Sequence, residues 1–228
     1  MQPSLLTDSS GANTIRSRFA GLHMAVDLKR LMHVENMTKF TVDTHIFREL
    51  GEYLVGRNST ALLELLKNSY DADAKRVTVY GSNLTEVESG LISVSDDGTG
   101  MTEGQFLSGF LRLASRTKVV DDRRSRVFGR RFTGAKGIGR LAAHKLARVL
   151  SVQTVPGDGH FKPAGPGTLA TIDWDKAEEY QTLDEVNSAK VVEMTTIPIV
   201  EGMIAGTEIR LQKLRKAWTK QELGRFLR

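Results

Sequence analysis

Three polar residues at helical spacing form the first candidate for chemistry. Glu64, Asn68 and Asp71 lie four and then three residues apart in the stretch ELLKNSYDADA, and this spacing puts their side chains on one face of a helix. An amide oxygen one turn from a carboxylate suits Mg²⁺, which takes few protein oxygens and completes its shell with water and phosphate. A polar stripe exposed to solvent would give the same pattern, so the triplet alone leaves both interpretations open.

A second candidate combines carboxylates with glycines in the stretch DDGTGMT, residues 96–102. Asp96 and Asp97 follow the apolar run LISVS, and Gly98 and Gly100 let the chain turn without a Cβ in the way. A carboxylate held there could accept a hydrogen bond from an exocyclic amine such as that of adenine. A turn in which Asp and Gly serve only the backbone geometry is the competing interpretation.

A third candidate is the glycine-rich stretch TGAKGIGR ahead of an expected helix. Gly134, Gly137 and Gly139 precede that helix, and free backbone N–H groups at a helix N-terminus can bind an anion. The stretch is no Walker A loop, because Ala135 stands where that motif needs lysine. Its Gly-x-x-Gly-x-Gly spacing, outside a βαβ unit, also differs from the dinucleotide-binding fingerprint. Alone, this loop is weak evidence for a site.

A long basic stretch lies between the second and third candidates. Residues 116–136 are rich in arginine and glycine without clear periodicity, which predicts a mobile loop. Its arginines are Arg116, Arg123, Arg124, Arg126, Arg130 and Arg131. Together with the formal net charge of +5, they permit contact with nucleic acid or nucleotide phosphates. A solvated basic loop is the simpler interpretation.

The surrounding elements predict a two-layer α/β sandwich. Helices interleave with strands in the first half of the chain, whereas strands follow one another in the second half, which favours antiparallel pairing. We therefore expect a mixed, largely antiparallel sheet with helices on one face. The expected helices are residues 45–56, 58–74, 102–115, a segment beginning at 137, and one beginning at 220. The expected strands are residues 39–44, 76–81, 91–96, the segment up to 154, 167–174, 191–200 and 206–214.

The composition indicates a soluble, cytoplasmic protein. The chain has 228 residues, no cysteine, and no apolar run long enough to cross a membrane. Residues 1–36 are interpreted as an N-terminal extension with a short helix within 19–34, and residues 37–215 as the main domain. Residues 216–228 are expected to begin a helix that leads into a further C-terminal region.

Taken in order, the three candidates resemble the GHKL ATPases, which include gyrase B, Hsp90, histidine kinases and MutL. The matching patterns are Glu-x-x-x-Asn-x-x-Asp-Ala, Asp-x-Gly-x-Gly-Met and Gly-x-x-Gly-x-Gly, followed by AGTEIRL, while LASRTK resembles the segment after the first lid helix. The resemblance covers about residues 40–215 and is strongest to bacterial Hsp90-like ATP-binding proteins. It implies a Bergerat fold, in which ATP lies between the helices and a mobile lid.

The resemblance also implies roles for individual residues. Glu64 would be the general base that polarises the attacking water, and Asn68 would bind Mg²⁺. Asp97 would recognise the adenine amine with support from Thr207. The remaining residues assigned to nucleotide binding are Asp71, Gly98, Gly100, Met101, Ser115, Lys118, Gly134, Lys136, Gly137, Ile138 and Gly139. Among these, Asp71 could instead be structural.

The expected function is Mg²⁺-dependent binding and slow hydrolysis of ATP, coupled to conformational change or ATP-dependent homodimerisation of a larger protein. A module that senses ATP or ADP without hydrolysis is one alternative. A metal-dependent nuclease using Glu64, Asp96 and Asp97 is another, with the arginine-rich loop on DNA. A histidine kinase is disfavoured, because His23, His33 and His45 lack the sequence context of a phosphoacceptor.

Overall fold

The structure is a computed structural model of the 228-residue chain, and it divides into two units, Met1–Phe40 and Thr41–Arg228. The structure describes residues 6–7, 13–19, 22–27, 41–54, 56–111, 124–133 and 139–226. No helix among them is long and apolar enough to span a bilayer.

The first unit contains a small antiparallel sheet. Its strands are β1 (Leu6–Thr7), β2 (Asn13–Phe19) and β3 (Leu22–Asp27), paired in that order. The helix expected within 19–34 is therefore wrong for residues 22–27. Leu22, Met24 and Val26 alternate with other residues, and this period of two fits a strand better than a helix.

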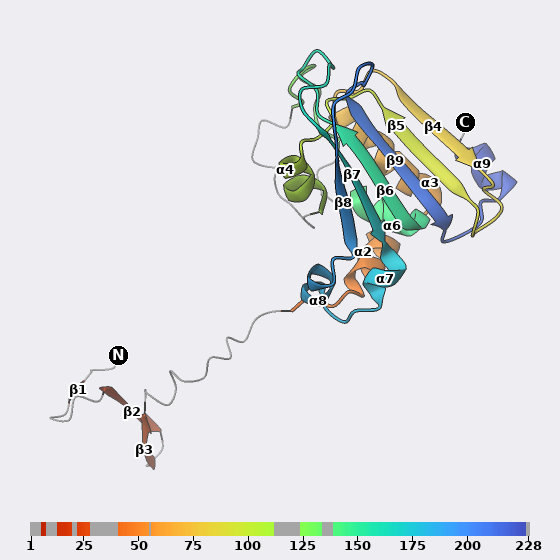
Figure 1. The fold of residues 1–228 in the computed structure, drawn as a ribbon. Coiled ribbons are helices and arrows are strands. Elements are labelled where there is room, and N and C mark those ends of the chain that lie inside the picture. The colour runs from red at the N-terminus through yellow and green to blue at the C-terminus, as the bar shows by residue number, and fades with distance from the viewer. Residues whose placement is uncertain are drawn as a thin grey trace. The chain divides into compact units, whose positions relative to one another are not determined.

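The second unit is built on one six-stranded sheet in the order β4-β5-β9-β6-β7-β8, with every neighbouring pair antiparallel (Figure 1). The strands are β4 (Val77–Ser82), β5 (Leu91–Asp96), β6 (Ala147–Val155), β7 (Gly167–Asp173), β8 (Val192–Ile197) and β9 (Gly206–Leu214). The expected α/β sandwich with a largely antiparallel sheet is confirmed. The expected strand at 39–44 is wrong for its described part, where Asp43 makes only an isolated bridge to Thr182.

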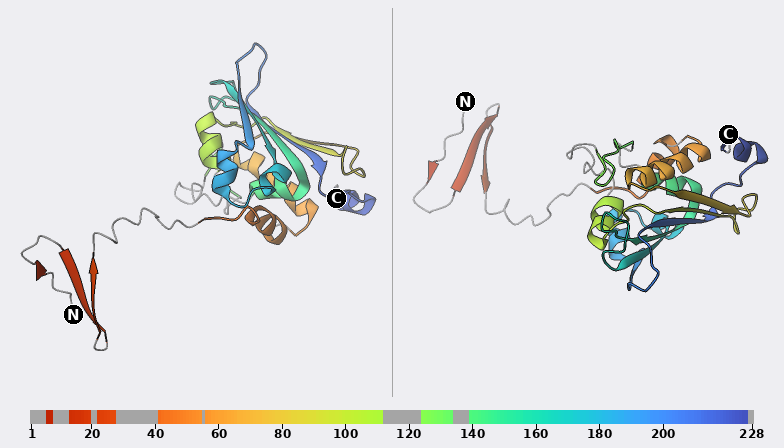
Figure 2. Two further views of the ribbon diagram at one scale, coloured as in Figure 1. Left: turned by 60° about the horizontal axis from the view of Figure 1, so that its bottom comes forward. Right: turned by 90° about the horizontal axis from the view of Figure 1, so that it is seen from above.

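Helices α2 (Ile46–Leu54), α3 (Asn58–Asp71) and α6 (Gly139–Leu146) lie together behind the sheet in Figure 1, and Figure 2 shows α3 along one face of the strands. The shorter helices are α4 (Glu103–Gln105), the π-helix η1 (Phe106–Leu111), α7 (Trp174–Glu178), α8 (Leu183–Ser188) and α9 (Lys220–Phe226). Helices α7 and α8 were not expected from periodicity. The capping box of α8, in which Thr182 and Glu185 bond each other's backbone N–H, was their clearest local signal.

The core lies between the sheet and this helical layer. Leu62 and Leu65 of α3 are almost fully buried, as are Leu146 of α6, Val152 of β6 and Leu211 of β9. Burying a leucine side chain contributes about 2 kcal/mol, so this apolar face fixes α3 on the sheet. The polar residues of α3 are thereby held in one orientation relative to the strand ends.

Candidate nucleotide site

A row of polar side chains crosses three neighbouring strands at one end of the sheet. Asp96 ends β5 and lies opposite Thr207 of β9, which in turn lies opposite Thr154 of β6. The hydroxyls of Thr154 and Thr207 are 3.0 Å apart, and the fully buried Thr154 hydroxyl accepts a 2.9 Å hydrogen bond from the backbone N–H of Met101. Met101 and Thr207, both predicted site residues, therefore contact the same Thr154 hydroxyl.

Asp96 is the carboxylate that completes this row. Its Oδ2 accepts a 2.7 Å hydrogen bond from the Ser69 hydroxyl on α3, and its Oδ1 accepts a 3.0 Å bond from the backbone N–H of Gly98. Burial raises the pKa of Asp96 above its usual value, while the bonds from Ser69, Gly98 and Thr207 act against that rise. A buried carboxyl with a perturbed pKa is a typical feature of a functional site.

Asp97 lies elsewhere in the structure. Its Oδ1 accepts hydrogen bonds from the backbone N–H groups of Lys75 and Arg76, at 2.7 and 2.8 Å. Successive side chains of a strand point to opposite faces, so Asp97 caps the turn after α3 while Asp96 meets Thr207. Counting two residues back from Gly98 in the pattern Asp-x-Gly-x-Gly gives Asp96, and that count would have identified it from the sequence.

Three glycines let the backbone segments of the site approach closely. Gly100 has φ +56°, and a Cβ there would overlap the carbonyl of Val155. Gly206 has φ +137°, and a Cβ there would overlap the carbonyl of Asp96. Gly98 is similarly crowded by the carbonyl of Ala72. A side chain at these positions would push apart the strand ends that carry the polar row.

The polar face of α3 runs from the middle of the helix to this end of the sheet. Glu64 is half-buried and forms a 2.7 Å ion pair with Lys67. Asn68 follows one turn later, and within the described part of the chain its side-chain amide makes no hydrogen bond. Its oxygen could therefore take a cation without breaking a bond seen here. A Mg²⁺ site of one protein oxygen plus water and phosphate fits this chemistry.

Asp71 serves the loop 124–133. It is buried, and its Oδ1 accepts hydrogen bonds from the backbone N–H and the hydroxyl of Thr133, at 2.8 and 3.0 Å. These bonds support the structural alternative for Asp71. They also show that this part of the arginine-rich stretch, expected to be a mobile loop with few contacts, is anchored to α3.

Several predicted residues fall outside the described part of the chain. These are Ser115, Lys118, Gly134, Lys136, Gly137 and Ile138. Gly139 is described as the first residue of α6. Their assignment to the phosphates stays a prediction.

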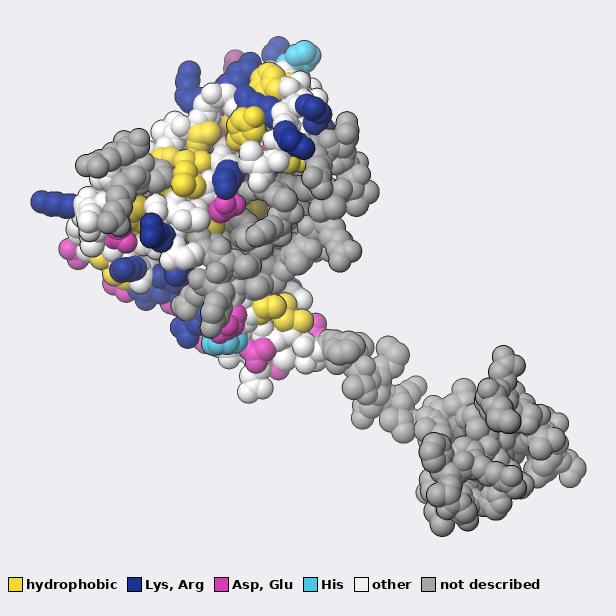
Figure 3. All heavy atoms as spheres, turned by 180° about the vertical axis from the view of Figure 1, so that it is seen from behind, with side chains coloured by type: hydrophobic (Ala, Val, Ile, Leu, Met, Phe, Trp, Pro, Cys, Tyr) yellow, Lys and Arg dark blue, Asp and Glu magenta, His cyan; other side chains and the backbone are white. Residues whose placement is uncertain are grey.

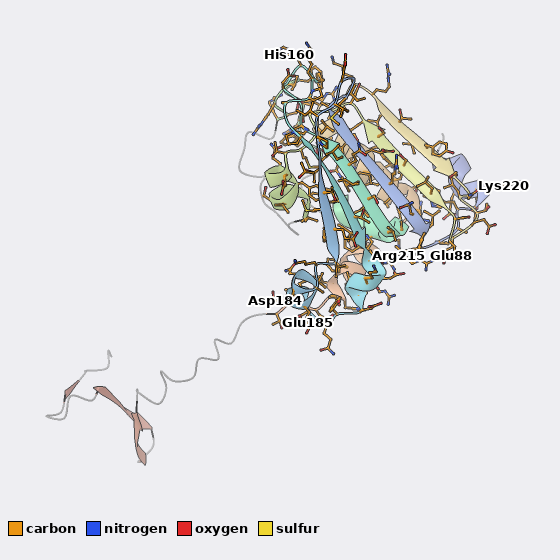
Figure 4. The ribbon with its side chains drawn as sticks, in the orientation of Figure 1. Glu88, His160, Asp184, Glu185, Arg215 and Lys220 are labelled. Atoms are coloured by element: carbon orange, nitrogen blue, oxygen red, sulfur yellow. The ribbon has the colours of Figure 1, made fainter. Side chains whose placement is uncertain are left out.

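The opposite end of the sheet holds a cavity of about 800 Å³, and none of the predicted site residues that the structure describes lines it. Its lining includes Arg48, Arg57, Lys145, Arg148, Arg215 and Lys216. Arg215, labelled in Figure 4, follows β9 at the end away from Thr207. Its guanidinium bonds Glu178 at 2.9 Å, and the buried His144 lies 2.8 Å from the same carboxylate. These ionic contacts indicate a structural cluster.

Comparisons with known proteins identify the family to which the chain belongs. Residues 56–199, more than half of the chain, match the family described as histidine kinase-, DNA gyrase B-, and HSP90-like ATPase. The chain is 35% identical over 96 residues to the DNA mismatch repair protein MutL of Paramagnetospirillum magneticum, covering 42% of this chain and 15% of MutL. It is 31% identical over 113 residues to a putative type II restriction enzyme, HgiDII, of Herpetosiphon aurantiacus, covering 50% of this chain and 17% of that protein.

Among solved structures, the N-terminal domain of a DNA repair protein aligns with a TM-score of 0.44 at 19% identity, covering 74% of this chain and 39% of that one. The chain thus spans less than a fifth of the length of the two curated relatives. The particular closeness to Hsp90-like proteins stays a prediction. The family match over residues 56–199 nevertheless places the chain in the GHKL superfamily, as a member of the histidine kinase-, DNA gyrase B-, and HSP90-like ATPase family.

Proposed function

We propose that this chain binds ATP with the adenine amine on Asp96 and hydrolyses it slowly in the presence of Mg²⁺. The observation that supports this most is the row formed by Asp96, Thr207 and Thr154, fixed from α3 by the Ser69 hydroxyl. A carboxylate whose position is set by a hydroxyl and an amide N–H keeps acceptor capacity for a ligand amine. Asp96 thus replaces Asp97 as the proposed adenine-recognising residue.

The phosphates would lie along α3 toward Glu64. Asn68 would hold Mg²⁺, which neutralises charge on the phosphates when bound. Glu64 would accept a proton from the water that attacks the γ-phosphorus, while the bond to ADP breaks and ADP keeps the electron pair. Glu64 would then have to exchange its ion pair with Lys67 for a contact with that water. The glycine-rich segment before α6 would bind the phosphates through backbone N–H groups.

The proposed role of the module in a larger protein rests on structural change upon ATP binding. ATP binding would change the conformation of a longer cytoplasmic protein or bring two copies together. The MutL and restriction-enzyme relatives favour a protein that acts on DNA. A module that binds nucleotide without hydrolysis remains the alternative. Steady phosphate release above that of Glu64→Ala would exclude it.

The nuclease alternative loses support. Glu64 pairs with Lys67, Asp96 bonds Ser69, and Asp97 bonds the backbone of Lys75 and Arg76. Within the described ranges, no group of three or more His, Asp or Glu side chains is placed to hold a metal ion. The three carboxylates that a nuclease would need therefore serve separate local contacts.

The direct test compares Asp96→Asn with the neighbouring control Asp97→Asn by calorimetric titration with ADP and Mg²⁺. Losing a charged acceptor costs about 1.5–3 kcal/mol, so Asp96→Asn should weaken ADP binding roughly tenfold to a hundredfold. Asp97→Asn keeps an oxygen for Lys75 and Arg76 and should bind ADP as the wild type does. If only Asp97→Asn weakened binding, Asp97 would be the adenine-recognising residue after all. Unchanged affinity in both variants would overturn the adenine site.

A further inference from the structure

Three segments that meet beside the candidate nucleotide site carry seven cationic residues, and we call the surface that these segments form the arginine face. Its members are Lys75, Arg76, Arg124, Arg126, Arg130, Arg131 and Lys162. Figure 3 shows Lys and Arg side chains gathered at this end of the molecule around hydrophobic ones, beside a histidine, and Figure 4 labels His160 at the same end. Within the described part of the chain, none of the seven forms an ion pair.

The loop 124–133, which supplies four of these cations, has its backbone held by several hydrogen bonds. Arg124 and Arg131 form an isolated antiparallel bridge, and Ser125 and Arg130 bond each other at 2.7 and 2.8 Å. The fully buried Asp73 accepts hydrogen bonds from the backbone N–H groups of Val127 and Phe128, at 2.9 and 3.3 Å. The loop therefore presents its arginines from a fixed backbone.

Three described acidic side chains near this face, Asp73, Asp97 and Asp158, accept hydrogen bonds from main-chain N–H groups. Asp73 binds the loop, and Asp97 binds the N–H groups of Lys75 and Arg76. Asp158 accepts from the N–H groups of His160 and Lys162, at 2.8 and 3.1 Å. These three carboxylates fix the backbone without pairing with the cationic side chains, so among the described residues the positive charge of the face is left for an external anion.

Aromatic rings hold two of the cations in place. The Arg130 guanidinium lies 4.8 Å from the ring centres of both Tyr70 and Phe128. Phe128 stacks on Phe161 with 5.7 Å between ring centres, and the Lys75 ammonium lies 4.8 Å from the Phe161 ring. Such contacts position a cation without neutralising it, and they reduce the ordering entropy lost when an anion binds.

We propose that the arginine face binds the phosphodiester backbone of nucleic acid. A fixed array of unpaired cations across a loop, a helix end and a second loop matches an extended polyanion better than a single small anion. Guanidinium groups suit phosphate oxygens because their donors form a planar fork. The contacts are with phosphate, so binding should be independent of base sequence.

The test uses the 228-residue chain and fluorescence anisotropy of a labelled oligonucleotide, as single strand and as duplex, over a range of salt concentrations. Arg126→Glu with Arg131→Glu should weaken binding at least about tenfold at low salt and reduce the duplex salt slope by roughly two. The control is Lys216→Glu with Lys220→Glu, which makes the same change of charge at the other end of the sheet near the basic cavity. The control should keep most of the affinity.

Two further measurements distinguish a loss of binding from a loss of folding or an effect of added negative charge. Melting temperatures of both double variants should stay near that of the wild type, and the milder pair Arg126→Gln with Arg131→Gln should give a smaller loss in the same direction. Equal losses in the arginine and lysine variants, or no binding by the wild type at low salt, would overturn the proposal. Binding to anionic phosphatidylserine vesicles with none to oligonucleotide would overturn it in favour of a membrane surface.

Discussion

Each end of the six-stranded sheet holds a carboxylate, and the two carboxylates have different kinds of partner. At one end, Asp96 is buried against hydroxyl and amide groups, and its hydrogen-bond partners Ser69, Gly98 and Thr207 are all uncharged. At the other end, Glu178 bonds His144 at 2.8 Å and Arg215 at 2.9 Å, with Arg48 at 3.9 Å. The second carboxylate is neutralised within the chain, whereas the first keeps the capacity to bind something else.

The pKa values of the titratable groups at the two ends support this distinction between them. Burial, followed by the Arg215 charge, lowers the pKa of His144 to about 4, so this histidine is neutral at pH 7. Burial raises the pKa of Asp96. A satisfied ionic cluster is a common structural feature, while a buried carboxyl held by neutral donors at a strand end is more typical of a ligand site.

The largest expected effect is on the rate of hydrolysis. Glu64→Ala should lower steady-state phosphate release roughly 10²-fold or more if Glu64 is the general base, and it should leave ATP bound. At the opposite end, Glu178→Gln should keep most of the activity of the molecules that fold. The measurement is phosphate release alongside ATP affinity for both variants. Equal rates for wild type and Glu64→Ala would assign the proton transfer to another group.

Much of this site follows from local patterns. The helical spacing of Glu64 and Asn68 and the apolar run ending at Asp96 predict elements that the structure contains. Thr154 was missed because it joins the site only through the pairing of β6 with β9, more than 50 residues apart in sequence. Local patterns do not encode that pairing.

The arginine-rich loop shows the other way in which local patterns fall short. Its composition predicts few contacts, yet Asp71 and Asp73 hold its backbone from the end of α3. Asp73 has φ +63°, an uncommon conformation that aspartate tolerates better than most residues. The partners of a buried carboxylate depend on the tertiary fold, so composition alone could not identify them.

The next largest effect expected is on the pH dependence of stability, to which the two ends of the sheet contribute with opposite sign. His144 has a folded pKa of about 4, whereas an unperturbed histidine has a pKa of 6.5, so the unfolded chain binds the proton more readily between these values. The contribution of His144 to the free energy of unfolding is therefore fully present above about pH 6.5. It falls by up to about 3 kcal/mol as the pH drops toward 4. Asp96 has the opposite sign, because its raised folded pKa favours protonation in the folded state.

Urea unfolding of wild type and His144→Gln from pH 7 to pH 4 measures this contribution. The wild type should lose stability over that range more steeply than the variant, whose side chain does not titrate. The variant will also be less stable at pH 7, because the Glu178 contact changes. Parallel curves for the two proteins would mean that His144 is protonated normally in the folded state.

A smaller effect is expected from Arg215→Ala at the structural end. The change removes partners of Glu178 and of the His144 carbonyl, to which the Arg215 Nε donates at 2.8 Å. Both side chains of the pair are partly exposed, so we expect a loss of about 1–2 kcal/mol. ADP affinity of the folded protein should be unchanged. A large loss of ADP affinity with unchanged stability would show that the cluster reaches the nucleotide site.

The smallest expected effect tests whether the polar row acts as a unit. Thr154→Val keeps the shape of a fully buried side chain but removes the hydroxyl that accepts from Met101 N–H and lies 3.0 Å from the Thr207 hydroxyl. One hydrogen bond contributes about 1 kcal/mol, so ADP affinity should fall severalfold through the altered position of Thr207 and Met101. Thr171→Val is the matched control, because its hydroxyl on β7 lies 3.3 Å from that of Ser151 and outside the row. Titration with ADP and urea unfolding together separate the two roles. A Thr154→Val variant that lost stability like the control but bound ADP as tightly as the wild type would confine Thr154 to the fold and leave Asp96 to recognise the base without it.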